Sequence, residues 1–189
     1  MNKKHSVILV LIACMLLTTF TSCILGSTSN KSEEDESFRA VHSTISDLAI
    51  SFPSSWDENL EMNEEATIGM LSSNNRQSFV VIEEPISDFA DDMSIQDYGD
   101  IILENMKDML SDAETGAEGW VETSIGDGIP AMQIFIKGTM EKIKFSYLVT
   151  VFKESDEFCQ AVACTSQSDY DDSEALFKKI LSTAEFSAS

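Results

Sequence analysis

The chain has 189 residues, and its 33 aspartates and glutamates against 12 lysines and arginines give a formal net charge of −21. This acidity argues against a nucleic-acid partner, because surfaces that bind nucleic acids are basic. Hydrophobic residues form 43% of the chain, which suffices for an ordinary core and argues against wholesale disorder. The length fits one domain with accessory segments.

Residues 1–22 have the features of a signal peptide for export. A short basic segment precedes an apolar run over residues 7–17. Residues 20–23 then read Phe-Thr-Ser-Cys and resemble the lipobox of bacterial lipoproteins, which implies that Cys23 receives diacylglycerol and becomes the mature N-terminus. We therefore expect a lipid-anchored protein at the cell membrane that faces outside the cytoplasm.

Two alternatives to lipidation at Cys23 stay open. A second lipobox-like segment ends at Cys14, although cleavage there would leave apolar residues at the new N-terminus. The segment could also be a plain signal peptide or an uncleaved helix, but its apolar part is shorter than the ~20 residues that a spanning helix needs. Residues 23–42 are Ser-rich and then acidic, which is typical of a tether.

The remaining residues, 43–187, are expected to form a single mixed domain. Residues 94–97 read Ser-x-x-Asp and predict the capping box of a helix that runs to about residue 110, and a second helix is expected over 171–184. The predicted strands cover residues 48–52, 66–71, 78–82, 120–125, 131–136, 144–152 and 158–164. Because the last two strands carry apolar residues on both faces, we expect a layered α+β fold whose sheet is covered on each side.

Three short motifs in this order resemble the PsbP-like superfamily. Residues 51–56 read Ser-Phe-Pro-Ser-Ser-Trp, residues 128–131 read Gly-Ile-Pro-Ala, and residues 177–182 read Phe-Lys-Lys-Ile-Leu-Ser. The resemblance covers residues 40–187 and implies an antiparallel β-sheet flanked by helices, a PsbP-like α/β/α sandwich. It also implies a non-enzymatic accessory or binding role, since none of the matching positions is catalytic.

The sequence predicts no catalytic residue, cofactor site or metal site. His5 and His42 are the only histidines, which excludes multi-histidine metal sites, and there is no Gly-x-Ser-x-Gly elbow. The acidic runs 88–92 and 169–174 could offer carboxylates to calcium, but both open or precede a predicted helix, where acids stabilise the N-terminal dipole. Residues 126–128, Gly-Asp-Gly, are too short for a phosphate loop and predict a turn.

Two cysteines and two tryptophans are better explained as core residues. Cys159 and Cys164 lie five strand residues apart, about 16 Å at 3.3 Å per residue, and would point to opposite faces. A disulfide between them stays possible only if this segment is not a strand. Trp56 and Trp120 are expected in the core or at its rim.

Three functions compete at this point. We favour a membrane-anchored, non-enzymatic module that binds an envelope protein. The second is a lipoprotein that binds a small ligand or a cation, which needs a concave acidic pocket. The third is a carboxylate-dependent hydrolase, which needs two acids in one cleft.

Overall fold

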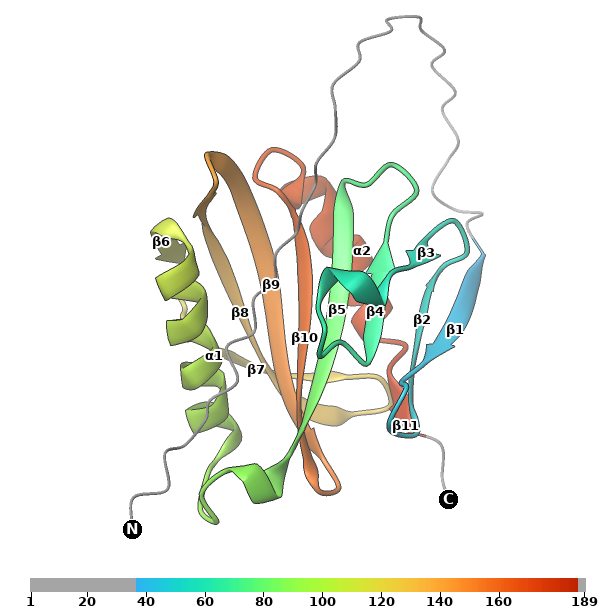
Figure 1. The fold of residues 1–189 in the computed structure, drawn as a ribbon, viewed down its shortest axis with the longest axis vertical. Coiled ribbons are helices and arrows are strands. Elements are labelled where there is room, and N and C mark those ends of the chain that lie inside the picture. The colour runs from blue at the N-terminus through green and yellow to red at the C-terminus, as the bar shows by residue number, and fades with distance from the viewer. Residues whose placement is uncertain (1–36, 187–189) are drawn as a thin grey trace, which may run out of the picture.

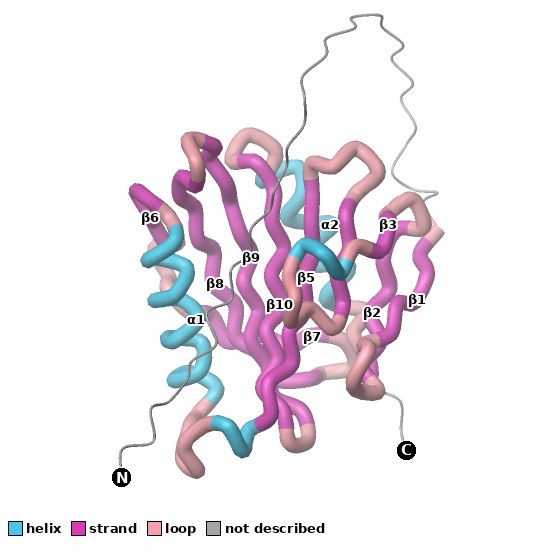
Figure 2. Tube along the Cα trace, viewed as in Figure 1, coloured by secondary structure: helices cyan, strands magenta, loops and turns pink. Residues whose placement is uncertain are grey.

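The computed structural model describes residues 37–186. The predicted signal peptide, the lipidation site Cys23 and residues 23–36 of the predicted tether lie outside this range. Within it, no helix is both long enough and apolar enough to cross a membrane. Strands make up much of the described chain (Figure 2). They pair in an antiparallel manner, and two α-helices accompany them.

The larger sheet has eight strands in the order β3-β4-β5-β10-β9-β8-β6, and β7 also pairs with β8 (Figure 1). All of these pairings are antiparallel. The strands are β3 Asp57–Glu58, β4 Ile68–Leu71, β5 Gln77–Pro85, β6 Ser111–Thr115, β7 Val121–Ile125, β8 Ile129–Met140, β9 Ile143–Glu154 and β10 Glu157–Ser166. The predicted strands of this sheet are confirmed.

The two faces of the sheet belong to separate apolar clusters. The helix α1 Ile95–Met109 buries Tyr98, Ile102 and Met106, at helical spacing, in the same cluster as one face of β9 and β10. The helix α2 Tyr170–Leu181 buries Phe177 and other residues in the cluster of the opposite face. Successive residues of β9 and β10 are therefore buried on both faces of the sheet.

A smaller sheet with the order β1-β2-β11 completes the cluster on the α2 side. Its strands are β1 Phe38–His42, β2 Leu48–Pro53 and β11 Glu185–Phe186. Residues 38–42, which the composition places in the tether, thus form a paired strand, and the folded part begins before residue 43. The sequence gives little sign of β1, because Val41 is the only buried residue of this five-residue strand.

The turn between β7 and β8 contacts the end of α2. Gly126 has a φ of +48°, and its N–H donates to the carbonyl oxygen of Leu181 at 3.1 Å. A Cβ atom at this position would lie 1.7 Å from the carbonyl oxygen of Ala184. Only glycine fits this close approach, so residues 126–128 serve as the turn that the sequence predicted.

Candidate functional site

A pocket of about 360 Å³ opens at the middle of β8, on the side of the sheet that α2 covers. β6 pairs with β8 at residues 136–139, whereas β7 pairs with residues 129–133 of the same edge. The connecting loop 116–120 crosses the gap, and the N–H of Gly116 donates to the carbonyl oxygen of Phe135 at 3.0 Å. Gly119, with a φ of +65°, lets the loop turn back toward β7.

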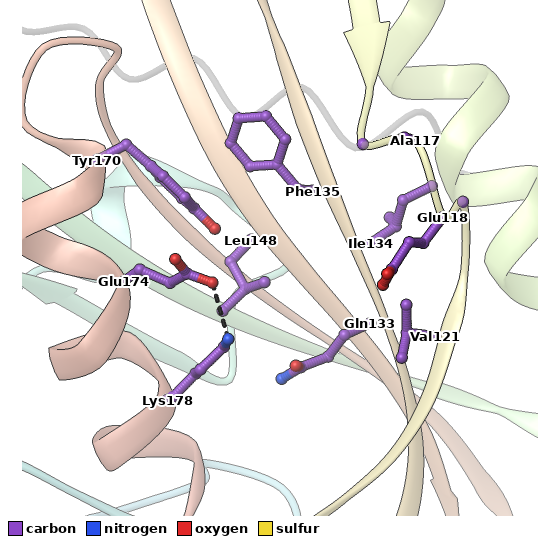
Figure 3. A pocket seen from close by; sticks show the side chains of 12 residues that line it. Ala117, Glu118, Val121, Gln133, Ile134, Phe135, Leu148, Tyr170, Glu174 and Lys178 are labelled. Atoms are coloured by element: carbon purple, nitrogen blue, oxygen red, sulfur yellow. Dashed lines mark ion pairs between the residues drawn. The ribbon is translucent and has the colours of Figure 1, made fainter.

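One stripe of α2 forms the opposite wall (Figure 3). Tyr170, Glu174 and Lys178 are spaced four residues apart, so their side chains lie along one helix face. The Glu174 carboxylate forms an ion pair with the Lys178 ammonium group, at 2.7 Å between Oε1 and Nζ. The glutamate lies on the N-terminal side of the lysine, which is the favourable order in a helix. The two charges of this wall therefore neutralise each other.

The floor of the pocket is apolar and partly aromatic. The rings of Phe135 and Tyr170 lie 4.6 Å apart between centroids at an interplanar angle of 55°. Leu148 from β9 lies beside them, and Val121 extends the apolar surface to the rim with 42% of its area exposed. The floor can hold an apolar or planar group against two ring systems.

The hydroxyl of Tyr170 points into the pocket from this floor (Figure 3). Burial raises the pKa of Tyr170 above its usual value, and the charges of Glu174 and Asp171 raise it further. The phenol therefore keeps its proton at neutral pH. It can donate a hydrogen bond to a ligand, but it does not supply a base.

Glu118 and Gln133 complete the polar groups that face the pocket (Figure 3). The side-chain amide of Gln133 donates to the hydroxyl of Thr150 at 3.0 Å, which fixes its direction. Glu118 is exposed, and no lysine or arginine within residues 37–186 forms an ion pair with it. The site thus combines an apolar floor, a neutral donor, a balanced ion pair and one uncompensated carboxylate.

A second polar cluster lies at the far end of β5, on the same side of the sheet. The buried carboxylate of Glu83 accepts hydrogen bonds from the hydroxyls of Ser43 and Thr67, the latter at 2.6 Å. Cys159 faces Glu83 across the β5–β10 pairing. Within residues 37–186, no group of three or more His, Cys, Asp or Glu side chains is arranged to hold a metal ion. This carboxylate ties the β1–β2 loop and the start of β4 to β5.

A third polar group lies on the α1 side. The hydroxyl of Tyr98 donates to Glu84 at 2.7 Å, and the amide of Gln160 donates to the same carboxylate oxygen at 3.4 Å. Burial is the main reason that the pKa of Glu84 is raised. The Tyr98 ring also stacks on Phe158 at 4.8 Å, so the group fastens α1 to the sheet.

The residues that the sequence singled out fall into different places. Within the acidic run 169–174, Tyr170 and Glu174 line the pocket and Asp169 pairs with Arg76 at 3.6 Å. The run 88–92 lies in the connection to α1, away from the pocket lining. His42 is an exposed residue of β1.

The cysteines and tryptophans are placed as expected. Cys159 and Cys164 are both buried, one in each of the two opposite clusters. Trp56 is buried in the cluster on the α2 side. Trp120 packs at the rim of the α1 side, where its indole N–H donates to Asp100 at 3.0 Å.

Sequence reasoning missed the pocket as a site. Glu118, Gln133 and Lys178 belong to a loop, a strand and a helix that only the fold brings together. The one available signal was the short run Gly-Ala-Glu-Gly at residues 116–119. Its two glycines indicate a loop, and the acid between them is a polar group that such a loop can present.

No protein-family model matches the chain, and no curated protein matches its sequence. Solved structures do match its fold. CyanoP, the cyanobacterial PsbP of Synechocystis sp. PCC 6803, is 12% identical with a TM-score of 0.59, over 86% of this chain and 99% of CyanoP. LpqN of Mycobacterium tuberculosis, described as involved in cell envelope biogenesis, is 12% identical with a TM-score of 0.54, over 80% of this chain and 91% of LpqN.

The Ran-binding protein Mog1p of Saccharomyces cerevisiae is also similar, with 10% identity and a TM-score of 0.50 over 76% of this chain and 85% of Mog1p. At these identities the likeness concerns the fold alone. The chain therefore has an α+β fold similar to that of PsbP, in agreement with the fold class expected from the sequence.

Proposed function

We propose that this protein is an exported lipoprotein, anchored through Cys23, whose domain is a non-enzymatic binding module with a PsbP-like α/β/α arrangement. The basic segment, the apolar run and the lipobox-like residues 20–23 support export and anchoring. LpqN, a protein of similar fold, is described as acting in cell envelope biogenesis, so the fold has a precedent in an envelope role. The partner is an envelope protein close to the same membrane.

The pocket between the loop 116–120 and α2 is the observation that carries the binding role. Its volume of about 360 Å³ is at the small end of the range for ligand sites, about 300–1,000 Å³. Its polar groups suit recognition, because Tyr170 keeps its proton and Glu174 is engaged by Lys178. A small free ligand is the second candidate, since a pocket of this size also accommodates one.

The experiment is affinity capture of the full chain from crosslinked membranes of a bacterial host, with mass spectrometry as the readout. We expect a specific partner with the wild type and its loss in Cys23→Ala, which removes the acylated sulfur. Cys14→Ala tests the rival lipobox and is expected to leave anchoring unchanged. Incorporation of a labelled fatty acid into Cys23→Ala, with normal membrane retention, would contradict the proposed anchor.

A pair of matched variants tests the pocket in the same experiment. Ala117→Trp places a large ring at an exposed position of the pocket lining, so we expect the partner to be lost while the anchor is retained. Ala90→Trp places the same ring at an exposed position outside that lining and should leave capture unchanged. Equal capture with both variants would show that the partner does not use the pocket.

A further inference from the structure

We infer that the pocket receives a basic side chain of the partner polypeptide. This side chain is of the arginine type, with a planar cation at the end of a hydrocarbon stem. This inference rests on the proposed function and names the chemistry of its partner. Three features of the pocket support it. They are the aromatic floor, the Glu118 carboxylate that no described lysine or arginine pairs with, and the pairing of Lys178, the only lysine among the described lining residues, with Glu174.

The floor suits a planar cation. The tilted rings of Phe135 and Tyr170 lie side by side at 4.6 Å, and the face of an aromatic ring attracts a guanidinium or ammonium group. A guanidinium also stacks on such rings, because it is flat and weakly hydrated. Leu148 and Val121 supply apolar contact for the hydrocarbon stem.

The charge balance of the lining is negative. Glu118 and Glu174 contribute two carboxylates, and Lys178 contributes one cation that Glu174 holds at 2.7 Å. Because Tyr170 is neutral, Glu118 remains the uncompensated group, and its carboxylate faces the pocket in Figure 3. A bidentate contact with a guanidinium would satisfy both of its oxygens.

An anionic ligand fits this site poorly. Lys178, the only cation among the described lining residues, is already paired with Glu174, and the Glu118 carboxylate would repel an anion. The chain as a whole carries a formal charge of −21, which also steers cations toward it. Electrostatic complementarity therefore selects a positively charged group.

The rim favours a side chain on a polypeptide over a small free cation. Val121 leaves 42% of its surface exposed beside the opening. A polypeptide whose basic side chain enters the pocket can cover this apolar surface with its neighbouring residues, whereas a small cation inside the pocket cannot. Burial of this area adds to the affinity of a polypeptide alone.

The test is a set of peptide titrations in which ligand-observed NMR measures binding. The full chain, purified from membranes, is placed in nanodiscs of phosphatidylcholine, a lipid without net charge, and empty nanodiscs serve as the blank. The probes are the peptide Gly-Ser-Arg-Ser-Gly, the same peptide with neutral citrulline or with glutamate in place of arginine, and the free cation agmatine. If the chain proves to be unanchored, the same titrations run in solution, so failure of the anchor and failure of this inference are distinguishable.

We expect the arginine peptide to bind about three- to tenfold more tightly than the citrulline peptide, and the glutamate peptide to bind weakest. Glu118→Gln should abolish the preference for arginine over citrulline. Glu122→Gln removes an exposed carboxylate of β7 outside the pocket lining and should retain the preference. The loss in Glu118→Gln together with its retention in Glu122→Gln would separate the pocket from the general acidity of the surface.

Three outcomes would overturn the inference. Equal binding of the arginine and citrulline peptides would exclude recognition of charge. Equal losses in Glu118→Gln and Glu122→Gln would assign the binding to the overall negative field. Tighter binding of agmatine than of the arginine peptide would assign the pocket to a small free cation.

Discussion

Glu157 is the carboxylate in the described domain whose burial is least compensated. One of its oxygens is buried without a hydrogen-bond partner among residues 37–186. Desolvation raises the pKa of Glu157, and the charges of Glu83 and Asp156 raise it further. Glu83, by contrast, is satisfied by two hydroxyl groups. The ionised form of Glu157 therefore costs free energy in the folded state.

We predict that Glu157→Gln stabilises the domain at neutral pH. A raised pKa means that the folded state favours the protonated carboxyl, so the wild type loses stability as the pH rises from about 4.5 through the raised value. The free energy of unfolding of the variant should exceed that of the wild type near pH 7, by an amount that solvent screening keeps small because Glu157 is only half-buried, and by almost nothing near pH 4. Urea unfolding at both pH values measures the difference.

Glu64→Gln is the matched control for this prediction, because Glu64 is exposed between Asn63 and Glu65 in the connection to β4. Its effect should be small and nearly equal at both pH values. A gain for Glu157→Gln that is as large near pH 4 as near pH 7 would contradict the role assigned to its ionisation.

At the scale of elements, the start of α1 depends on a reciprocal pair of contacts. Ser94 accepts a hydrogen bond from the N–H of Asp97 at 3.1 Å, and the Asp97 carboxylate accepts one from the N–H of Ser94 at 3.0 Å. The pKa of Asp97 is lowered because its carboxylate accepts hydrogen bonds from the hydroxyl of Ser94 and from the N–H of Ser94. The predicted capping box is thus confirmed, with both of its bonds present.

We predict that Ser94→Ala destabilises the domain by about 1 kcal/mol, because the N–H of Asp97 loses its acceptor and the Asp97 carboxylate loses a hydroxyl donor. For a chain of this length, the midpoint of thermal unfolding should fall by about 2–4 °C. Ser87→Ala, in the exposed 3-10 turn that precedes the helix, is the control and should change the midpoint little. A normal midpoint for Ser94→Ala would mean that packing alone sets the start of α1.

The long elements could be predicted because each has a strong local pattern. β9 and β10 are apolar on both faces, and α1 combines a cap with helical spacing. β1, β6 and β11 could not be predicted, since they are short strands with few buried residues. Their pairing partners, and not their own composition, make them strands.

The pocket could not be predicted for a topological reason. Gly116 and Phe135 meet only because β6 and β7 share one edge of β8 and leave its centre to the loop. The sequence shows Tyr170 and Glu174 only as part of an acidic helix start. Which face of α2 they occupy becomes clear once α2 packs on the sheet.

At the scale of the whole molecule, repulsion between like charges opposes folding. The formal net charge is −21, and the described ion pairs are between exposed or half-exposed side chains, such as Arg39 with Glu58 and Lys107 with Glu104. Exposed pairs each contribute only about 0–1 kcal/mol. We therefore expect this repulsion, and not the ion pairs, to determine how the stability of the domain changes with ionic strength.

We predict that the urea midpoint of unfolding rises as sodium chloride is increased from about 0.01 M to about 0.15 M, because the Debye length shortens from about 30 Å to about 8 Å. Choline chloride at the same ionic strength should give the same rise, since the effect is screening. A midpoint that falls with salt would show that the ion pairs dominate. A rise with sodium alone would indicate specific binding of that ion.

The placement of Cys159 and Cys164 gives this domain an internal reporter of local unfolding. Each thiol is buried in a different layer, Cys159 beneath α2 and the small sheet, and Cys164 beneath α1. A thiol reagent can reach either sulfur only when its own layer opens, and the thiolate is the reactive form. The relative labelling rates of the two cysteines, read by mass spectrometry, therefore rank the two layers by their opening free energies without any substitution in the described domain.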